Sequence, residues 1–321
     1  MTVALSVAPR LSVVIATDTY DRIRLVIESL ERQTMAAEIE LIIVTTAPDE
    51  ARAEAANEGA FYSVRIVETD SIVPLSRARA KGVLATSAPF IFIAETHAYP
   101  DPGLAERLVS ALSGPWSLAV PGFRNSNPGN GLSWAGFLSD YGAWARGLPA
   151  GETDRAPSHD AAFRRNVLLE FGDRMENALT FGDELYLGLK ARGHKAYFEP
   201  DAGIEHVNIS RFGDFVGERF CSGVLIGGYR STSWRWSKRI AYACATPLIA
   251  VVILSRVRKG VMEASRRENL PTGTFPALIL GVLLKVAGEF RGYLTGVTHS
   301  AEERMTAYEV RKLAFNAGEE A

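Results

Sequence analysis

One stretch of the sequence has the clearest structural signal: Pro89-Phe90-Ile91-Phe92-Ile93-Ala94-Glu95-Thr96-His97-Ala98-Tyr99-Pro100. Its apolar run, residues 90–94, predicts a short strand buried on both faces, as strands are in a parallel sheet covered by helices. The run leads directly into Glu95 and His97. Because ligands of open α/β sheets bind at the carboxyl ends of the strands, we expect a binding site here.

Glu95 and His97 can both ligate a metal ion. A carboxylate suits hard cations, and an imidazole suits Mn, Zn or Fe. Two such side chains, one residue apart at a strand end, can converge on one cation. The alternative interpretation is that Glu95 is a polar strand end and His97 a turn residue, as most polar residues at strand ends are. The pair alone favours this alternative, so the rest of the chain has to decide.

The composition is that of a globular chain, long enough for one large or two ordinary domains. Of its 321 residues, 47% are apolar and 22% are charged, which is inconsistent with disorder. A net charge of −2 gives no basic footprint for nucleic acid. Cys221 and Cys244 form neither a disulfide framework nor a zinc spacing, which fits a reducing compartment. Residues 1–10 lack the pattern of a signal peptide.

Strands and helices are predicted to alternate along the first part of the chain. Apolar, β-branched runs predict strands, and apolar residues at helical spacing predict helices. The predicted strands are residues 11–16, 41–44, 64–67 and 90–94, and the predicted helices are 23–33, 51–58, 75–84 and 104–112. This alternation predicts an α/β fold with a mostly parallel, doubly wound sheet and right-handed crossovers.

The middle of the chain is less regular. We expect a strand at residues 117–120, a loop at 125–131 and a flexible connection at 147–157. A helix is predicted at residues 183–192, closed by a glycine C-cap at Gly193. Short apolar segments at residues 196–198 and 202–204 follow.

The composition changes after about Arg211. An uncharged run, residues 240–254, is shorter than the roughly 20 residues of a membrane-spanning helix and contains Pro247. A second apolar run covers residues 275–284. Basic residues and Trp flank these runs, which favours helices that lie in the headgroup region of a membrane. The alternative is a helix pair packed on the catalytic domain or on a dimer partner. We therefore expect two regions, residues 1–210 and 211–321.

Taken in chain order, several segments resemble a family 2 glycosyltransferase of the GT-A fold. Residues 11–17 resemble its first strand, and residues 75–82 resemble its Ala-Arg-Asn-x-Gly helix. Residues 95–97 stand in the place of its Asp-x-Asp metal motif. Residues 158–165 resemble its Asn-x-Ala-Phe-Arg-Arg segment near the acceptor, and residues 183–206 resemble its acidic helix and terminal histidine. Each match is weak alone, but their ordered combination is specific.

The resemblance implies roles for individual residues. It implies a nucleotide-sugar donor and a divalent cation, Mn²⁺ or Mg²⁺, held by Glu95, His97 and His206. It implies Asp183 as the general base, with Glu184 as the second candidate. The positions that it implies for donor binding are Ala16, Thr17, Thr45, Arg79, Glu95 and Thr96.

Some positions depart from the family pattern. Ala16 replaces the usual Pro, Ala80 replaces Asn, and Thr45 replaces an Asp that reads the nucleobase. Counted back from Gly193 without gaps, the acidic pair of the family would fall at residues 181–182, and Asp183 and Glu184 stand just after those positions. Each implied role has a structural alternative: a surface charge for Arg79, a core histidine for His206, and capping of a helix N-terminus for the acidic pair.

The sequence thus predicts a metal-dependent, inverting glycosyltransferase at the cytoplasmic face of a membrane. It would move one sugar from a nucleotide-sugar to a lipid-linked or polysaccharide acceptor, with no nucleic-acid partner. The cation and basic side chains would stabilise negative charge on the diphosphate leaving group. Two alternatives stay open: a nucleotidyltransferase, and a catalytically inactive membrane scaffold. Self-association into a homo-oligomer is open as well.

Overall fold

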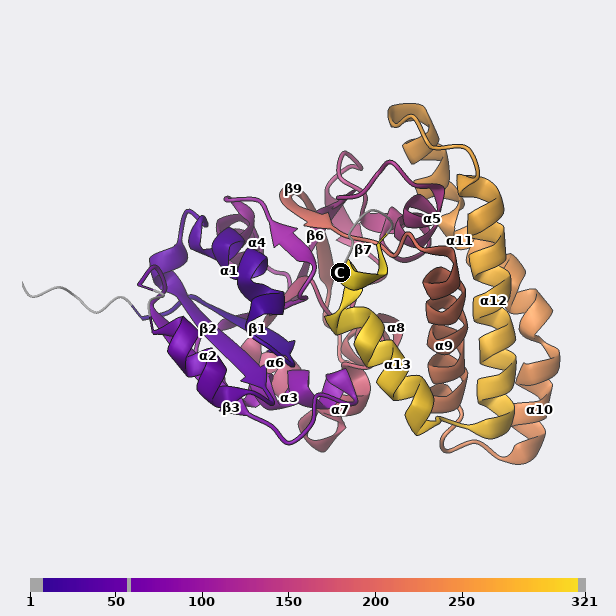
Figure 1. The fold of residues 1–321 in the computed structure, drawn as a ribbon, viewed down its shortest axis with the longest axis horizontal. Helices are drawn as coiled ribbons and strands as arrows, with labels where there is room; N and C mark the ends of the chain where they lie inside the picture. Colours follow the sequence, from indigo (N-terminus) through magenta and orange to yellow (C-terminus); the bar gives the residue numbers. More distant parts are fainter. Residues whose placement is uncertain (1–7, 57–58, 317–321) are drawn as a thin grey trace, which may run out of the picture. The chain divides into compact units, whose positions relative to one another are not determined.

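The computed structural model describes residues 8–56 and 59–316 (Figure 1). The chain divides into two compact units, which we describe one at a time. Unit 1 is Met1–Gly122 with Pro149–Glu205, and unit 2 is Phe123–Leu148 with His206–Ala321. The division expected between residues 210 and 211 did not anticipate that residues 123–148 group with the C-terminal helices.

A mixed sheet is the centre of unit 1. Its strands follow the order β3-β2-β1-β4-β8-β6-β9-β5, and β7 pairs with β9. Strands β3, β2, β1 and β4 are parallel to one another, whereas β8 is antiparallel to both β4 and β6. The strands are β1 (Leu11–Thr17), β2 (Ile39–Thr45), β3 (Ser63–Glu68), β4 (Phe90–Ala94), β5 (Ala98–Pro100), β6 (Leu118–Asn125), β7 (Gly151–Thr153), β8 (Ala161–Arg164) and β9 (Ala196–His206).

Helices cover both faces of the parallel part of this sheet. Figure 1 shows α1 and α4 on one side of it and α2 and α3 on the other. All residues of β1 and β2 are buried as a result, which explains why both read as continuous apolar runs. The helical segments of unit 1 are η1 (Asp21–Ile23), α1 (Arg24–Glu31), η2 (Ala36–Glu38), α2 (Pro48–Ala55), α3 (Leu75–Ala85), α4 (Leu104–Ser113), α6 (Arg165–Leu169), η4 (Gly172–Arg174), α7 (Met175–Ala178) and α8 (Gly182–Lys190).

Two sequence predictions for unit 1 were wrong. The segment expected to be a flexible connection contains β7, which pairs with β9 from Gly151 to Thr153. The two short segments predicted before His206 are one strand, β9. Pro200 lies inside β9, although proline is rare inside strands. Gly122 of β6 lies against the backbone of Pro200, where any side chain would collide.

Unit 2 is helical apart from the ends of β6 and β9. It contains α5 (Gly131–Asp140), η3 (Gly142–Trp144), α9 (Phe212–Arg230), α10 (Trp236–Cys244), α11 (Thr246–Arg267), α12 (Thr274–Thr295), α13 (His299–Val310) and η5 (Lys312–Phe315). The apolar run at residues 240–254 is divided between α10 and α11, which meet at a bend of 58°. Pro247 stands in the first turn of α11, where its missing N–H costs no hydrogen bond.

Helices α9 and α12 approach each other at backbone distance. A Cβ atom on Gly223 or Gly227 of α9 would collide with the Lys285 or Glu289 carbonyl oxygen of α12. Conversely, one on Gly292 of α12 would collide with the backbone of α9. These glycines therefore set the separation of the two helices.

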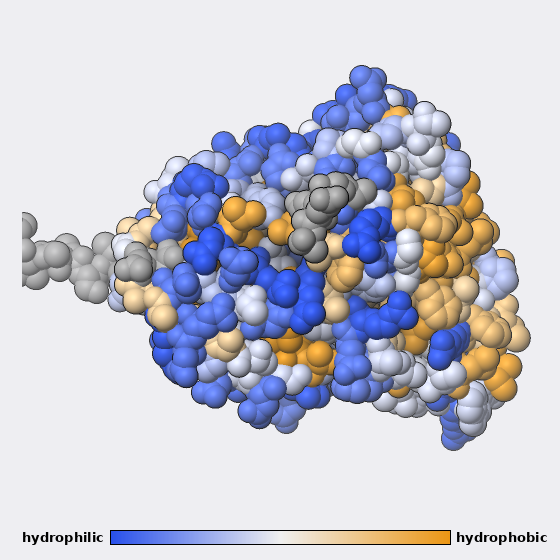
Figure 2. All heavy atoms as spheres, viewed as in Figure 1, coloured by the Kyte–Doolittle hydropathy of each residue, from blue (hydrophilic) through white to orange (hydrophobic). Residues whose placement is uncertain are grey.

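Large apolar side chains are exposed on α10, α11 and α12. Figure 2 shows hydrophobic residues gathered over this part of unit 2. They include Trp236, Ile240, Tyr242, Leu248, Val251, Val252, Met262, Phe275, Ile279, Leu283 and Phe290. Within the described residues no single helix has the length and apolar composition to cross a membrane, while α10 and α11 taken together pass that test as a bent pair. We call this surface the apolar face of unit 2.

Candidate active site

The carboxyl ends of β1, β2 and β4 lie at one edge of the sheet. Thr17 pairs with Thr45 in the register of β1 and β2, and Ile15 pairs with Ala94 in that of β1 and β4. Ala16, Thr17 and Thr45 are buried. The hydroxyl of Thr17 donates to the Thr19 carbonyl (2.7 Å), and that of Thr45 accepts from the Ala47 amide (3.1 Å). Both threonines therefore shape the loops that follow their strands.

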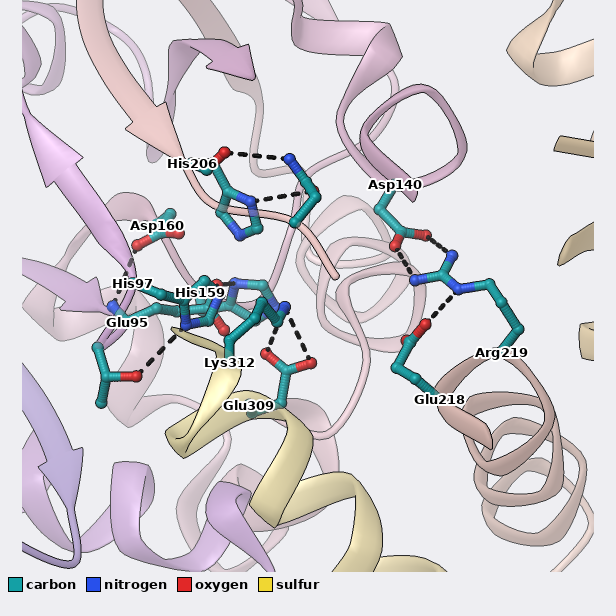
Figure 3. A network of polar contacts seen from close by, with 12 residues as sticks. Glu95, His97, Asp140, His159, Asp160, His206, Glu218, Arg219, Glu309 and Lys312 are labelled. Carbon is teal, nitrogen blue, oxygen red and sulfur yellow. Dashed lines mark hydrogen bonds and ion pairs between the residues drawn. The ribbon is translucent and has the colours of Figure 1, made fainter. Parts of the chain in front are cut away.

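Glu95, the first residue after β4, is the centre of a buried polar cluster (Figure 3). Its Oε1 atom lies 3.0 Å from Nη2 of Arg79. Its Oε2 atom lies 3.4 Å from Nε2 of His97 and 3.2 Å from Nδ1 of His159. One carboxylate thus contacts a guanidinium and two imidazoles, all within unit 1.

Arg79 is a buried residue of α3, only 7% exposed. The packing of α3 explains its position. Gly82, one turn further along, lies so close to Val14 and Val44 of the sheet that a Cβ atom would collide with both. Arg79 is therefore not the ordinary surface charge of the alternative interpretation. Its predicted contact with the donor stays a prediction.

His97 and Thr96 are also buried, at 0% and 4% exposure. The Oγ1 atom of Thr96 lies 3.3 Å from Nδ1 of His97. With a proton on Nδ1, the Nε2 lone pair of His97 points toward the same region as the Glu95 carboxylate. Nε2 of His97 and the Glu95 carboxylate are thus placed so that both could ligate one cation at the end of the strand.

Asp160 reaches this cluster through the antiparallel strand β8. In that register Ile93 pairs with Ala161, and the Asp160 amide donates to the Ile93 carbonyl (2.6 Å). Its Oδ1 atom accepts from the Glu95 amide at 3.2 Å. Its φ of 48° is left-handed, a conformation that Asp and Asn tolerate better than most residues. Asp160 is thus fixed beside Glu95 by backbone pairing.

The side chain of Asp160 is fully buried. Burial raises the pKa of this carboxyl well above its ordinary value, and the nearby negative charge of Glu95 raises it further. Among the described residues, its Oδ2 atom has no hydrogen-bond partner. In the sequence, His159 and Asp160 belong to the family-like segment 158–165, and no role was predicted for either residue. The signal that could have found them is the antiparallel pairing of β8 with β4.

The predicted general base lies at the start of α8, which begins at Gly182. Glu184 is exposed in the first turn. The side chain of Asp183 lies outside the described part of the structure. The backbone of Gly182 packs on the main chain of Ala156 and Pro157, which holds this helix end in place. Base and capping roles therefore both stay open for the acidic pair.

His206, the third predicted metal ligand, belongs to unit 2 and is fully buried. Its Nδ1 atom lies 3.2 Å from Oδ1 of Asn208, and its ring is 4.2 Å from the Tyr141 ring between centroids. A proton on Nδ1 would leave the Nε2 lone pair for ligation, as in many metal sites where an outer partner fixes the tautomer. Its role as a ligand stays a prediction.

A second charged network joins helices of unit 2 (Figure 3). Arg219 of α9 pairs with Asp140 of α5 (2.6 Å) and with the adjacent Glu218, and Lys285 of α12 lies 3.8 Å from Asp140. Burial raises the pKa of Asp140, but Arg219 and Lys285 outweigh it and hold that pKa below its ordinary value. The network contains two carboxylates and two basic groups, and its ion pairs join α5, α9 and α12 to one another.

Comparison with known proteins agrees with this geometry. Residues 12–171 match the family described as Glycosyl transferase family 2. The chain therefore belongs to glycosyltransferase family 2 and is a glycosyltransferase. No curated relative matches the chain.

Solved structures of glycosyltransferases are similar to the chain at low sequence identity. The mannosyltransferase PcManGT from Pyrobaculum calidifontis, in complex with GDP-Man and Mn²⁺, has a TM-score of 0.52 and 15% identity over 95% of this chain and 88% of that one. TarS 1–349 of S. aureus has a TM-score of 0.47 and 12% identity over 87% of this chain and 90% of that one. GalNAc-T7 with UDP, GalNAc and Mn²⁺ has a TM-score of 0.49 and 14% identity over 62% of this chain and 44% of that one. This chain spans less than half of the GalNAc-T7 chain. The fold is the predicted GT-A type.

Proposed function

We propose that this protein is a metal-dependent, inverting glycosyltransferase that moves one sugar from a nucleotide-diphosphate sugar to a lipid-linked or glycan acceptor. The observation that carries the proposal is the cluster at the end of β4, where the Glu95 carboxylate contacts Arg79 and His97. It combines metal-ligating groups with a fixed guanidinium. A family 2 domain surrounds it.

Residues Glu95 and His97 would hold the cation. One carboxylate and one imidazole fit Mn²⁺, which accepts both kinds of ligand. PcManGT, which shares the fold, was solved with Mn²⁺ and GDP-Man, and this supports the choice. A bound divalent cation supplies stabilisation of the negative charge that develops on a diphosphate leaving group.

Arg79 would act on the same charge in two ways. Its ion pair fixes the Glu95 carboxylate in one orientation, and its guanidinium adds a permanent positive charge to the site. Because the pair is buried, water screens this charge weakly. Preorganised charge of this kind is what electrostatic catalysis requires.

Inversion needs one general base that removes the proton of the acceptor hydroxyl. Asp183 is our first candidate and Glu184 the second. Both stand in the first turn of α8. An ionised carboxylate is the form that can accept a proton.

The test is a thermal-shift panel of UDP, GDP, CDP and ADP, each with Mn²⁺ and with EDTA. A ligand that binds only the folded protein raises the melting temperature. We expect one or two nucleotides to do so, and only with Mn²⁺. Mn²⁺-dependent release of free sugar from the matching donor should follow. The proposal fails if no nucleoside diphosphate stabilises the protein in the presence of Mn²⁺.

The same assay separates the alternatives. A nucleotidyltransferase would accept a nucleoside triphosphate and release pyrophosphate instead of free sugar. An inactive scaffold would neither hydrolyse a donor nor show a metal-dependent shift. We expect neither result, since a buried Arg–Glu–His cluster is costly to retain without a ligand to bind.

For unit 2 we propose attachment to the cytoplasmic face of a membrane. The apolar face exposes large side chains such as Leu248 (69%) and Val251 (64%) to solvent. Exposed basic residues flank it: Arg235, Lys238, Arg256, Arg258 and Lys259. Apolar residues between basic ones suit a lipid surface with anionic headgroups. Such an attachment would favour a lipid-linked acceptor.

A further inference from the structure

We propose that Asp160 ligates the catalytic cation together with Glu95 and His159. The inference rests on the proposed function and adds a ligand pair to it. One ligand atom from each of the three residues lies within 4.8 Å of the others. Two ligands about 2.2 Å from a shared ion lie at most about 4.4 Å apart, so small side-chain rotations would complete the site.

The first argument is the unpaired oxygen of Asp160. The residue is 0% exposed, and its Oδ2 atom has no hydrogen-bond partner among the described residues. A buried carboxylate oxygen without a donor is costly, because it has lost water and gained nothing in return. One oxygen of Asp160 and one oxygen of Glu95 belong to the same group of possible ligand atoms. A cation between the two carboxylates would remove this cost.

The second argument is the balance of charge. Arg79 is the guanidinium in contact with Glu95, and it neutralises one carboxylate. The second carboxylate leaves one negative charge in a buried site when both are ionised. A divalent cation would turn this into one positive charge, which suits a diphosphate. Mg²⁺ and Mn²⁺ are the ions that sites with two carboxylates and few imidazoles prefer.

The third argument is that an amide would satisfy this position without a metal. Asn tolerates the left-handed backbone of residue 160 as well as Asp does. Its oxygen would accept from the Glu95 amide, and its NH₂ group would donate to the Glu95 carboxylate. The chain has a carboxyl group instead, and its ionised form is a stronger ligand for Mg²⁺ or Mn²⁺ than an amide oxygen is.

The test compares D160N with E40Q in the full-length protein. Glu40 is an equally buried carboxylate, but Ser12, Ser87 and Arg65 hold it in hydrogen bonds and an ion pair outside the cluster. Mn²⁺ affinity is measured by calorimetry, and the melting temperature is measured in EDTA. D160N should weaken Mn²⁺ binding by at least about tenfold and melt no lower than the wild type. E40Q should melt lower and bind Mn²⁺ normally.

These outcomes separate the two proposals. Wild-type affinity in D160N, or a lower melting temperature of D160N in EDTA, overturns the role of Asp160 and leaves the proposed function standing. A wild-type protein that binds no Mn²⁺ overturns both. For His159, pulsed EPR of bound Mn²⁺ reports ligated imidazole nitrogen. The nitrogen signal should weaken in H159A, and an H159A signal equal to that of the wild type would remove His159 from the ligand set.

Discussion

Arg79 and Glu95 form an ion pair at 3.0 Å in which both side chains are buried, at 8% and 1% exposure. The pair joins α3 to the residue that follows β4, at the edge of the sheet where we propose a metal site. Arg77, two residues earlier on the same helix, forms a pair with Glu176 that is largely exposed. The two arginines therefore offer a matched comparison.

Arg79→Met should destabilise the protein by about 3 kcal/mol, because it leaves the Glu95 carboxylate buried without its cation. Arg77→Met should cost under about 1 kcal/mol, since water solvates both partners of that pair. Urea denaturation followed by circular dichroism measures both. Equal effects of the two substitutions would show that burial of the Arg79 pair is not what matters.

His97→Ala should abolish the Mn²⁺-dependent binding of a nucleoside diphosphate while the fold stays intact. The reason is its buried position beside Glu95. His194→Ala is the control, because His194 pairs with Glu170 and Ser117 away from β4. Calorimetry with and without Mn²⁺ is the measurement. Unchanged metal-dependent affinity of H97A would exclude His97 from the site.

Asp183→Asn should lower turnover by about 10² to 10⁴, the usual contribution of a general base, and leave donor binding nearly unchanged. Glu184→Gln is the matched comparison one residue further along α8. Steady-state kinetics with a fixed acceptor gives kcat and KM for both. If E184Q is the severe change, the base is Glu184. If both are mild, the acidic pair only caps the helix.

The stability that Glu40 contributes to the folded protein should be lost in acid. Burial raises the pKa of Glu40, but hydrogen bonds from Ser12 and Ser87 and the charge of Arg65 outweigh this, so its pKa is lowered from 4.5. A group with a lowered folded pKa stabilises above its unfolded pKa and loses this contribution as pH falls through the folded value. The stability gap between wild type and E40Q, about 1 to 3 kcal/mol near pH 7, should therefore shrink below pH 4.5.

Charges placed on the apolar face should release the protein from membranes. Leu248→Asp combined with Val251→Asp should abolish co-flotation with anionic liposomes, because a charge in the hydrocarbon boundary is costly. Leu25→Asp, at an exposed position of unit 1, is the control. Wild-type protein that stays at the bottom of the gradient at low and high salt, and elutes as a dimer without detergent, would show that this face packs on protein.

Elements with strong local signals could be predicted from the sequence. The strand at residues 90–94 was predicted with the bounds that β4 has. Helices α3 and α4 were predicted from their sequence pattern. Strands β1 and β2 are buried throughout, and parallel strands buried on both faces read as continuous apolar runs. Gly193 has a positive φ of 82°, as expected for a glycine after a helix, although α8 ends at Lys190 and its C-cap is Ala191. These features depend on residues close in sequence.

Features that depend on distant residues were missed. Asp160 and His159 meet Glu95 only through the register of β8 against β4, across more than 60 positions. Strand β7 is too short and polar to predict without its partner β9. The burial of Arg79 depends on how closely Gly82 lets α3 approach β1 and β2. In each case a tertiary contact outweighs the local pattern.

The glycine contact between α9 and α12 has a consequence for where unit 2 can function. Beside lipid, water does not drive the apolar side chains of two helices together. Contact between backbones relies instead on dispersion at short range, which is as strong beside lipid as beside water. Helices α9 and α12 can therefore keep one arrangement in both surroundings, and the outer surface of α12 can change its environment while its inner surface does not.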